Sequence, residues 1–161
     1  MNSKEYNRSV DLYSDNVYRF ILKNIRDEAR AQDIVQDSYE KLWRNLENVN
    51  AEKVKSYLFT TAYHTMIDVI RKDKRQGSIE DFKVPEDVHD EQYSDLTEVL
   101  NEAVKRLPEI QRTVILLRDY EGYSYKEIGD VTLLSEAQVK VYIYRARVFL
   151  KSYIGKMELV I

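Results

Sequence analysis

The chain contains no cysteine and only two prolines and four glycines in 161 residues. The absence of cysteine excludes a disulfide framework and a cysteine-based metal site. The shortage of glycine and proline argues against a turn-rich β fold and favours long helices. No stretch approaches the ~18 apolar residues of a transmembrane helix, and the N-terminal segment lacks a signal-peptide core. The composition therefore predicts an all-α protein of the cytoplasm.

Histidine is also scarce, since only His64 and His89 are present. Neither has a clustered partner with which it could bind a metal ion. The sequence has no glycine-rich phosphate loop, no nucleophile elbow and no H-E-x-x-H motif. Its many carboxylates show no spacing that singles out an acid–base pair. We therefore expect no enzymatic activity, no cofactor and no metal site.

The net charge of −3 is distributed unevenly along the chain. Residues 1–76 carry 14 basic and 12 acidic side chains, residues 77–98 carry 1 and 8, and residues 99–161 carry 10 and 8. Neutralisation of phosphates supplies most nonspecific affinity for DNA. Neither half is basic enough to be a strong DNA binder alone, so any DNA binding would be assisted by a larger partner.

Two helices joined by a tight turn are predicted near the C-terminus. The first runs from Ser124 to about Val131, and the second begins at Ser135, a favourable N-cap residue. Gly129 would let the two helices approach closely. A short helix, a turn and a longer basic helix form the helix-turn-helix pattern, whose second helix enters the DNA major groove. The alternative is an ordinary helical hairpin with a solvated basic face.

The second of these helices has two kinds of side chain. Residues 138–156 include five basic residues and no acidic ones. The predicted inward stripe is apolar and comprises Val139, Ile143 and Val148, with Ala146 and Leu150 close to it. The residues predicted to lie off this stripe are Lys140, Tyr144, Arg145, Arg147 and Lys151.

Amphipathic periodicity predicts further helices over residues 3–25, 27–46, 54–74, 95–106 and 108–120. The polar face of the second helix carries Asp33, Gln36, Asp37, Glu40, Lys41 and Arg44, and such faces are usually just solvated. The third helix ends in four cations within residues 71–75, which suit the helix dipole but could equally grip a phosphate backbone. Residues 77–94 contain Pro85 and six acids and are predicted to be a linker. The predicted domains are therefore residues 1–76 and 95–161.

Three segments in this order resemble bacterial RNA polymerase sigma factors of the compact, two-domain extracytoplasmic-function type. The segment A-Q-D-I-V-Q-D-S-Y-E-K-L-W-R at residues 31–44 resembles the family's core-binding helix. S-Y-L-F-T-T-A-Y-H-T-M-I-D-V-I-R-K-D-K-R at residues 56–75 resembles its promoter-melting helix. Residues 107–129, followed by Q-V-K-V-Y-I-Y-R-A-R at residues 138–147, resemble its second domain.

The resemblance implies a role for several groups of residues. Contacts with the clamp helices of core RNA polymerase are implied for Asp33, Gln36, Asp37, Tyr39 and Arg44. Contacts with the minus-ten promoter element, including capture of a flipped base, are implied for Asn48, Val49, Asn50, His64, Arg71, Lys72 and Arg75. Contacts with the minus-thirty-five element are implied for Ser135, Gln138, Lys140, Tyr144, Arg145 and Arg147.

The resemblance also implies further partners. The linker would thread the RNA channel of the polymerase, and the second domain would meet the polymerase flap. Members of this family are commonly held inactive by an anti-sigma factor, although no residue pattern here identifies one.

The sequence departs from the family pattern at a few positions. Leu133 stands where the turn usually has Gly or Asn, and a left-handed residue with a side chain costs roughly 1–2 kcal/mol, so the turn is open to reshaping. Val141 and Tyr142 replace Ser and Arg in the recognition helix, which affects the expected upstream sequence but not the mode of binding. Val49 stands where the capture loop has an aromatic residue.

Two other interpretations remain open from the residues alone. One is a stand-alone helix-turn-helix regulator whose N-terminal half is a sensor or dimerisation domain. The other is a helical adaptor that binds only proteins, which leaves the basic residues at 71–75 and 138–156 without a purpose.

Overall fold

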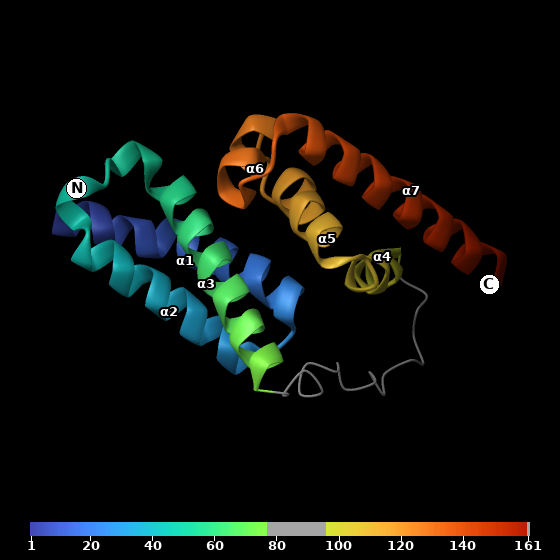
Figure 1. Ribbon diagram of the computed structural model, residues 1–161, viewed down its shortest axis with the longest axis horizontal. Coiled ribbons are helices and arrows are strands. Elements are labelled where there is room, and N and C mark those ends of the chain that lie inside the picture. Colours follow the sequence, from blue (N-terminus) through green and yellow to red (C-terminus); the bar gives the residue numbers. More distant parts are fainter. Residues whose placement is uncertain (77–95, 161) are drawn as a thin grey trace. The chain divides into compact units, whose positions relative to one another are not determined.

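The computed structural model describes residues 1–76 and 96–160, and every element within these ranges is helical (Figure 1). The all-α prediction is confirmed. The helices fall into two compact units, one formed around α1–α3 and the other around α4–α7. The predicted linker, residues 77–94, lies outside the described ranges. Within them, no helix is both long and apolar enough to cross a membrane.

The first unit consists of three long helices, α1 (Ser3–Ile25), α2 (Glu28–Arg44) and α3 (Val54–Arg75). Asn2 and Glu5 form a capping box at the start of α1, and Asp27 caps α2. The α2 helix ends slightly earlier than predicted, because two 3₁₀ turns, Leu46–Asn48 and Ala51–Lys53, connect it to α3. The fully buried side chains between the helices include Val17, Phe20, Ile21, Ala31, Leu42, Leu58, Phe59 and Met66.

The second unit begins with α4 (Leu96–Lys105) and α5 (Glu109–Ile115). The predicted helix over 108–120 is only partly regular, since its last turn, Leu116–Tyr120, is a π-helix. Gly122 follows with a φ of 73° and ends this segment. Two further helices, α6 (Tyr125–Thr132) and α7 (Glu136–Val160), then form the predicted helix-turn-helix.

The turn between α6 and α7 is defined by local interactions. Leu133 adopts the left-handed conformation with a φ of 64°, and its N–H donates to the Gly129 carbonyl oxygen at 2.8 Å. The expected reshaping of this turn therefore does not occur. A Cβ atom on Gly129 would lie 2.7 Å from the carbonyl oxygen of Leu134. The close approach at Gly129 is thus made to the turn backbone, and not to α7 as predicted.

The inward stripe of α7 is confirmed at Val139, Ile143 and Ala146, each at most 2% exposed. The prediction was wrong for Val148, which is 51% exposed. Val148 lies five positions beyond Ile143, which rotates its side chain by about 140° around the helix axis. The stripe instead follows steps of four and three residues.

Candidate polymerase and promoter interfaces

The outer face of α2 is charged and largely paired within the helix. Asp33 and Gln36 are exposed. Asp37 lies 3.3 Å from the Nζ atom of Lys41, and the Arg44 guanidinium forms an ion pair with Glu40. Exposed pairs of this spacing contribute only ~0.3–0.5 kcal/mol, so a binding partner can replace them at little cost.

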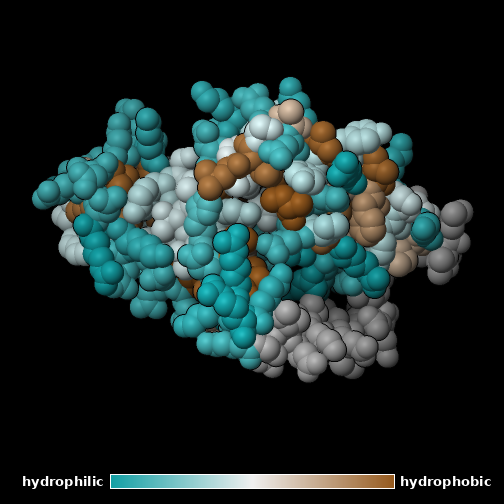
Figure 2. All heavy atoms as spheres, viewed as in Figure 1, coloured by the Kyte–Doolittle hydropathy of each residue, from teal (hydrophilic) through white to brown (hydrophobic). Residues whose placement is uncertain are grey.

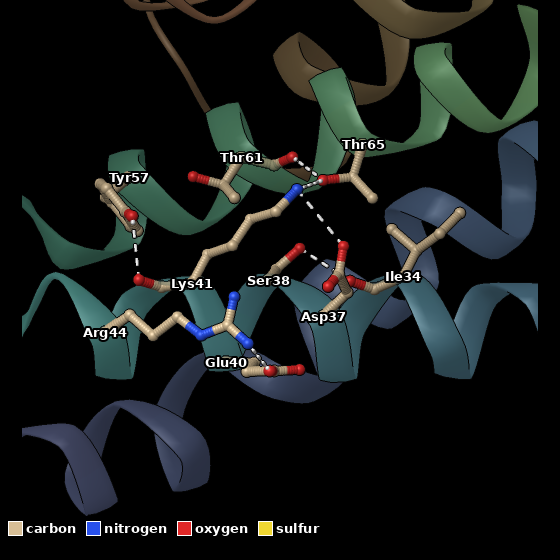
Figure 3. A network of polar contacts seen from close by, with 9 residues as sticks. All are labelled: Ile34, Asp37, Ser38, Glu40, Lys41, Arg44, Tyr57, Thr61 and Thr65. Carbon is tan, nitrogen blue, oxygen red and sulfur yellow. Dashed lines mark hydrogen bonds and ion pairs between the residues drawn. The ribbon is translucent and has the colours of Figure 1, made fainter.

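Lys41 also connects α2 to α3 (Figure 3). Its Nζ atom donates to Thr65 Oγ1 at 2.9 Å, next to the predicted base-pocket residue His64. Thr65 Oγ1 in turn donates to the Thr61 carbonyl at 2.7 Å. The face predicted to bind polymerase and the helix predicted to melt the promoter are therefore joined by direct hydrogen bonds.

Tyr39 is the buried member of the residues predicted to contact the polymerase. Its side chain is 7% exposed, and its hydroxyl donates to the Ser9 carbonyl of α1 at 2.8 Å. Burial raises the pKa of Tyr39 to about 12. The structure therefore does not place Tyr39 on the surface with Asp33, Gln36, Asp37 and Arg44. It holds α2 against α1.

The predicted capture loop presents two of its three residues. Asn48 and Asn50 are exposed, whereas the Val49 side chain is 7% exposed and faces the interior. Asn50 Oδ1 accepts from the Glu52 N–H at 3.0 Å and caps the following turn. Asn48 Nδ2 donates to Asn45 Oδ1 at 2.8 Å. Buried Val49 therefore anchors the loop, and the flanking amides provide its outward polar groups.

One face of α3 carries several of the predicted minus-ten contacts. His64, Arg71 and Arg75 are separated by seven and four residues, which places them on one side of the helix. The His64 ring is partly exposed and packs edge-on against Tyr63 with 5.2 Å between ring centroids. Arg71, Lys72 and Arg75 are exposed.

Asp73 is the one acid in this cationic helix end. It is 8% exposed and forms an ion pair with Arg30 near the start of α2. The acid is thereby turned toward the neighbouring helix, while the cations around it face solvent. Periodicity alone did not reveal this pair, because it joins residues that are 43 positions apart.

The predicted minus-thirty-five residues divide into two groups at the start of α7. Ser135 and Gln138 bond to each other: Gln138 N–H donates to Ser135 Oγ at 3.1 Å, and Ser135 N–H donates to Gln138 Oε1 at 2.9 Å. They cap the helix. Lys140, Tyr144 and Arg145 are exposed on its outer side. This cap and the buried stripe together fix which side chains α7 presents outward.

Two side chains that sequence reasoning missed support the cations of the second unit. Asp119, in the π-helical turn, forms an ion pair with Arg147 at 2.8 Å. The Tyr125 ring lies 4.7 Å from the Arg118 guanidinium and 5.8 Å from the Lys140 ammonium. Cation–π contacts of this kind restrain exposed cations. The partners come from different helices, so no spacing in the sequence indicated them.

Comparison with known proteins covers both units. Residues 10–76 match the family model described as Sigma-70 region 2, and residues 97–150 match the model described as Sigma-70, region 4. The chain is 30% identical over 146 residues to the ECF RNA polymerase sigma factor SigM of Bacillus subtilis (strain 168), covering 88% of this chain and 90% of SigM. It is 29% identical over 150 residues to RNA polymerase sigma factor SigV of the same strain, covering 91% and 89%.

A solved structure has the same fold. The sigma factor RpoE from Bartonella quintana, determined in complex with the anti-sigma factor NepR, aligns with a TM-score of 0.79 at 24% identity. The alignment covers 94% of this chain and 98% of that one.

A region 2 unit followed by a region 4 helix-turn-helix unit defines a transcription initiation factor of the sigma-70 class. The chain belongs to the extracytoplasmic-function (ECF) family of RNA polymerase sigma factors. It binds core RNA polymerase and directs promoter recognition and opening. A stand-alone helix-turn-helix regulator is not favoured.

Proposed function

We propose that the two units divide promoter recognition between them, with residues 1–76 serving the polymerase and the minus-ten element and residues 95–161 serving the minus-thirty-five element. The observation that carries this proposal is the outer side of α7. A capped N-terminus and a buried stripe leave Lys140, Tyr144 and Arg145 exposed together, as an insertion into the major groove requires. Arg147, paired with Asp119, would contact a phosphate.

Core polymerase would dock on the outer face of α2 through its clamp helices. Asp33, Gln36, Asp37 and Arg44 would make the contacts, and Tyr39 would act from inside by holding α2 in place. The weak intrahelical pairs of Asp37 and Arg44 support this assignment, because they can be exchanged for pairs with a partner. The polymerase flap would receive the second unit.

The loop before α3 and α3 itself would bind the minus-ten element. Asn48 and Asn50 would hydrogen-bond the edges of a flipped base, with Val49 anchoring the loop. Extrusion of a base costs a few kcal/mol, so it needs such compensating contacts. His64 would border the base pocket, and Arg71, Lys72 and Arg75 would hold the phosphate backbone.

The polymerase would supply all bond chemistry, and the sigma factor would need no metal or cofactor of its own. Because bacterial promoters and RNA polymerase are in the cytoplasm, the protein would act there.

The residues at 77–94 would pass through the RNA channel of the polymerase. An anti-sigma factor is a further proposed partner, supported by the fold shared with RpoE, which was solved with NepR.

In vitro transcription with core polymerase from the same host tests the proposal. Start sites mapped across a genomic library should depend on the sigma factor. The protein alone should bind promoter duplex weakly, whereas the holoenzyme should bind tightly and with strong salt dependence. Tight sequence-specific binding by the free protein, or the absence of start sites that require both the polymerase and this protein, would contradict the assignment.

A matched pair of variants tests the minus-ten assignment. Reversing charge at Arg71 and Lys72 should reduce open-complex formation at least tenfold, since two phosphate contacts become repulsive. Reversing the exposed Lys4 and Arg8 of α1 makes the same change in net charge and should have little effect. Equal losses in the two variants would show that total charge, and not the end of α3, is responsible.

A further inference from the structure

The recognition helix has a second apolar stripe on the side opposite its buried one. Steps of four, three and four residues place these side chains in one row along the helix. The row comprises Ala137, Val141, Tyr144 and Val148. It lies about 180° around the helix from the buried Val139, Ile143 and Ala146.

This outer row is well exposed. Val141 is 45% exposed, Tyr144 is 70% exposed and Val148 is 51% exposed. Figure 2 shows hydrophobic atoms exposed between hydrophilic ones on the surface that α7 forms. Single exposed apolar residues are ordinary, but a continuous row marks a surface that is covered in a complex.

The charges beside the row indicate what covers it. Helical spacing places Lys140 on one side of the row and Arg145 on the other, and both are exposed. An apolar centre between two cationic borders complements a DNA major groove, whose edges are phosphates and whose floor carries thymine C5-methyl groups.

We propose that Val141 and Tyr144 read thymine methyl groups in the minus-thirty-five element. The inference rests on the proposed function of α7 and adds a base specificity to it. Val141 lies in the second turn of α7 and Tyr144 in the third, the part of a recognition helix that reaches base edges. Val141 offers no hydrogen-bonding group, so its contribution to sequence reading comes from apolar contact, for which only thymine presents a methyl group in the groove.

The test removes one methyl group at a time from the promoter. An upstream element is first selected by the holoenzyme from a randomised library, and each thymine is then replaced by deoxyuridine. Loss of a buried methyl group should weaken holoenzyme binding about fourfold at one or more positions. In Val141→Ala the deoxyuridine penalty should disappear at one of these positions, and Tyr144→Ala should remove it at a neighbouring one.

Val148→Ala provides the matched control. It removes the same two methyl groups from an exposed valine of the same row, about 10 Å farther along α7, so the deoxyuridine penalties should persist. A further supporting result is tighter binding of the wild-type holoenzyme with 5-methylcytosine than with cytosine at the sensitive position, because 5-methylcytosine carries the same C5-methyl group as thymine.

Three outcomes would overturn the proposal: a selected element without thymine, deoxyuridine substitutions without effect, or an unchanged penalty in Val141→Ala. Each can occur while the holoenzyme still transcribes from the selected promoter, so they leave the proposed function intact. Failure of the holoenzyme to select any upstream element would instead contradict the proposed function itself.

Discussion

The two helical units position their functional side chains by different means. In the first unit, contacts between distant residues hold the helices together, such as Tyr39 to Ser9 and Lys41 to Thr65. In the second unit, the helix-turn-helix is set by contacts within a few residues, such as the Ser135–Gln138 cap and the left-handed Leu133. The first arrangement depends on packing across the fold, and the second on local turn chemistry.

The largest expected effect comes from breaking the local turn. In Gly129→Ala the new Cβ atom would meet the Leu134 carbonyl oxygen at 2.7 Å, and neither backbone can move without opening the turn. We expect a loss of about 2 kcal/mol in the second unit. Hydrogen exchange of the full-length protein should show faster exchange in α6 and α7 and unchanged exchange in α1–α3.

Gly155→Ala is the control for this variant. Gly155 also lies in a helix, but a Cβ atom there would meet nothing within 4 Å. The replacement should stabilise α7 by about 0.5–1 kcal/mol, because alanine loses less backbone entropy on folding. If Gly129→Ala were as stable as Gly155→Ala, the turn would not depend on the close approach.

A smaller effect is expected from breaking a long-range contact of the first unit. Tyr39→Phe removes the hydrogen bond to the Ser9 carbonyl and should cost about 1 kcal/mol at pH 7, measured by urea unfolding. Exposed Tyr144 provides the control, and Tyr144→Phe should change stability by less than about 0.5 kcal/mol.

The Tyr39 variant should also change how stability depends on pH. Burial raises the pKa of Tyr39 to about 12 in the folded protein, against about 10 in an unfolded chain. The wild type therefore loses stability as pH rises from 10 toward 12, by about 1.4 kcal/mol per unit. Phenylalanine has no proton to lose, so the difference between the two proteins should shrink above pH 10 and reverse near pH 11. A constant difference would show that Tyr39 is not buried.

The smallest expected effect comes from relieving backbone strain in the turn between α6 and α7. Leu133→Gly relieves the left-handed strain of roughly 1–2 kcal/mol but adds unfolded-state entropy worth 0.5–1 kcal/mol. Leu133 is 77% exposed, so little burial is lost. We expect a net gain of about 0.5 kcal/mol, seen as a small rise in the melting temperature of the second unit. Leu133→Ala keeps the strain and should be close to neutral.

The difference between local and long-range contacts also explains which features could be predicted from the sequence. The helices and the capped start of α7 follow from local signals, namely periodicity and capping residues. Boundaries such as the start of α7 were therefore predicted closely. The π-helical turn at residues 116–120 carries no such signal, because the residues there also suit an α-helix.

Side-chain placement in the first unit was predicted less well for a physical reason. Val49 belongs to a loop with polar exposed neighbours, and only the packing of this loop against the core decides that its side chain faces inward. The ion pair between Arg30 and Asp73 likewise depends on the tertiary fold. Sequence spacing identified the functional segments, whereas contacts between helices decide which of their side chains are available.

The Arg30–Asp73 pair has a further consequence for assembly of the holoenzyme. It fixes the cationic end of α3 to the first turn of α2, the helix whose outer face we assign to the polymerase. Docking α2 would then also set the direction in which Arg71, Lys72 and Arg75 point along the melted strand. The direction of this helix end would then be set during folding, so that promoter binding would have to order only the exposed cationic side chains and not the helix that carries them.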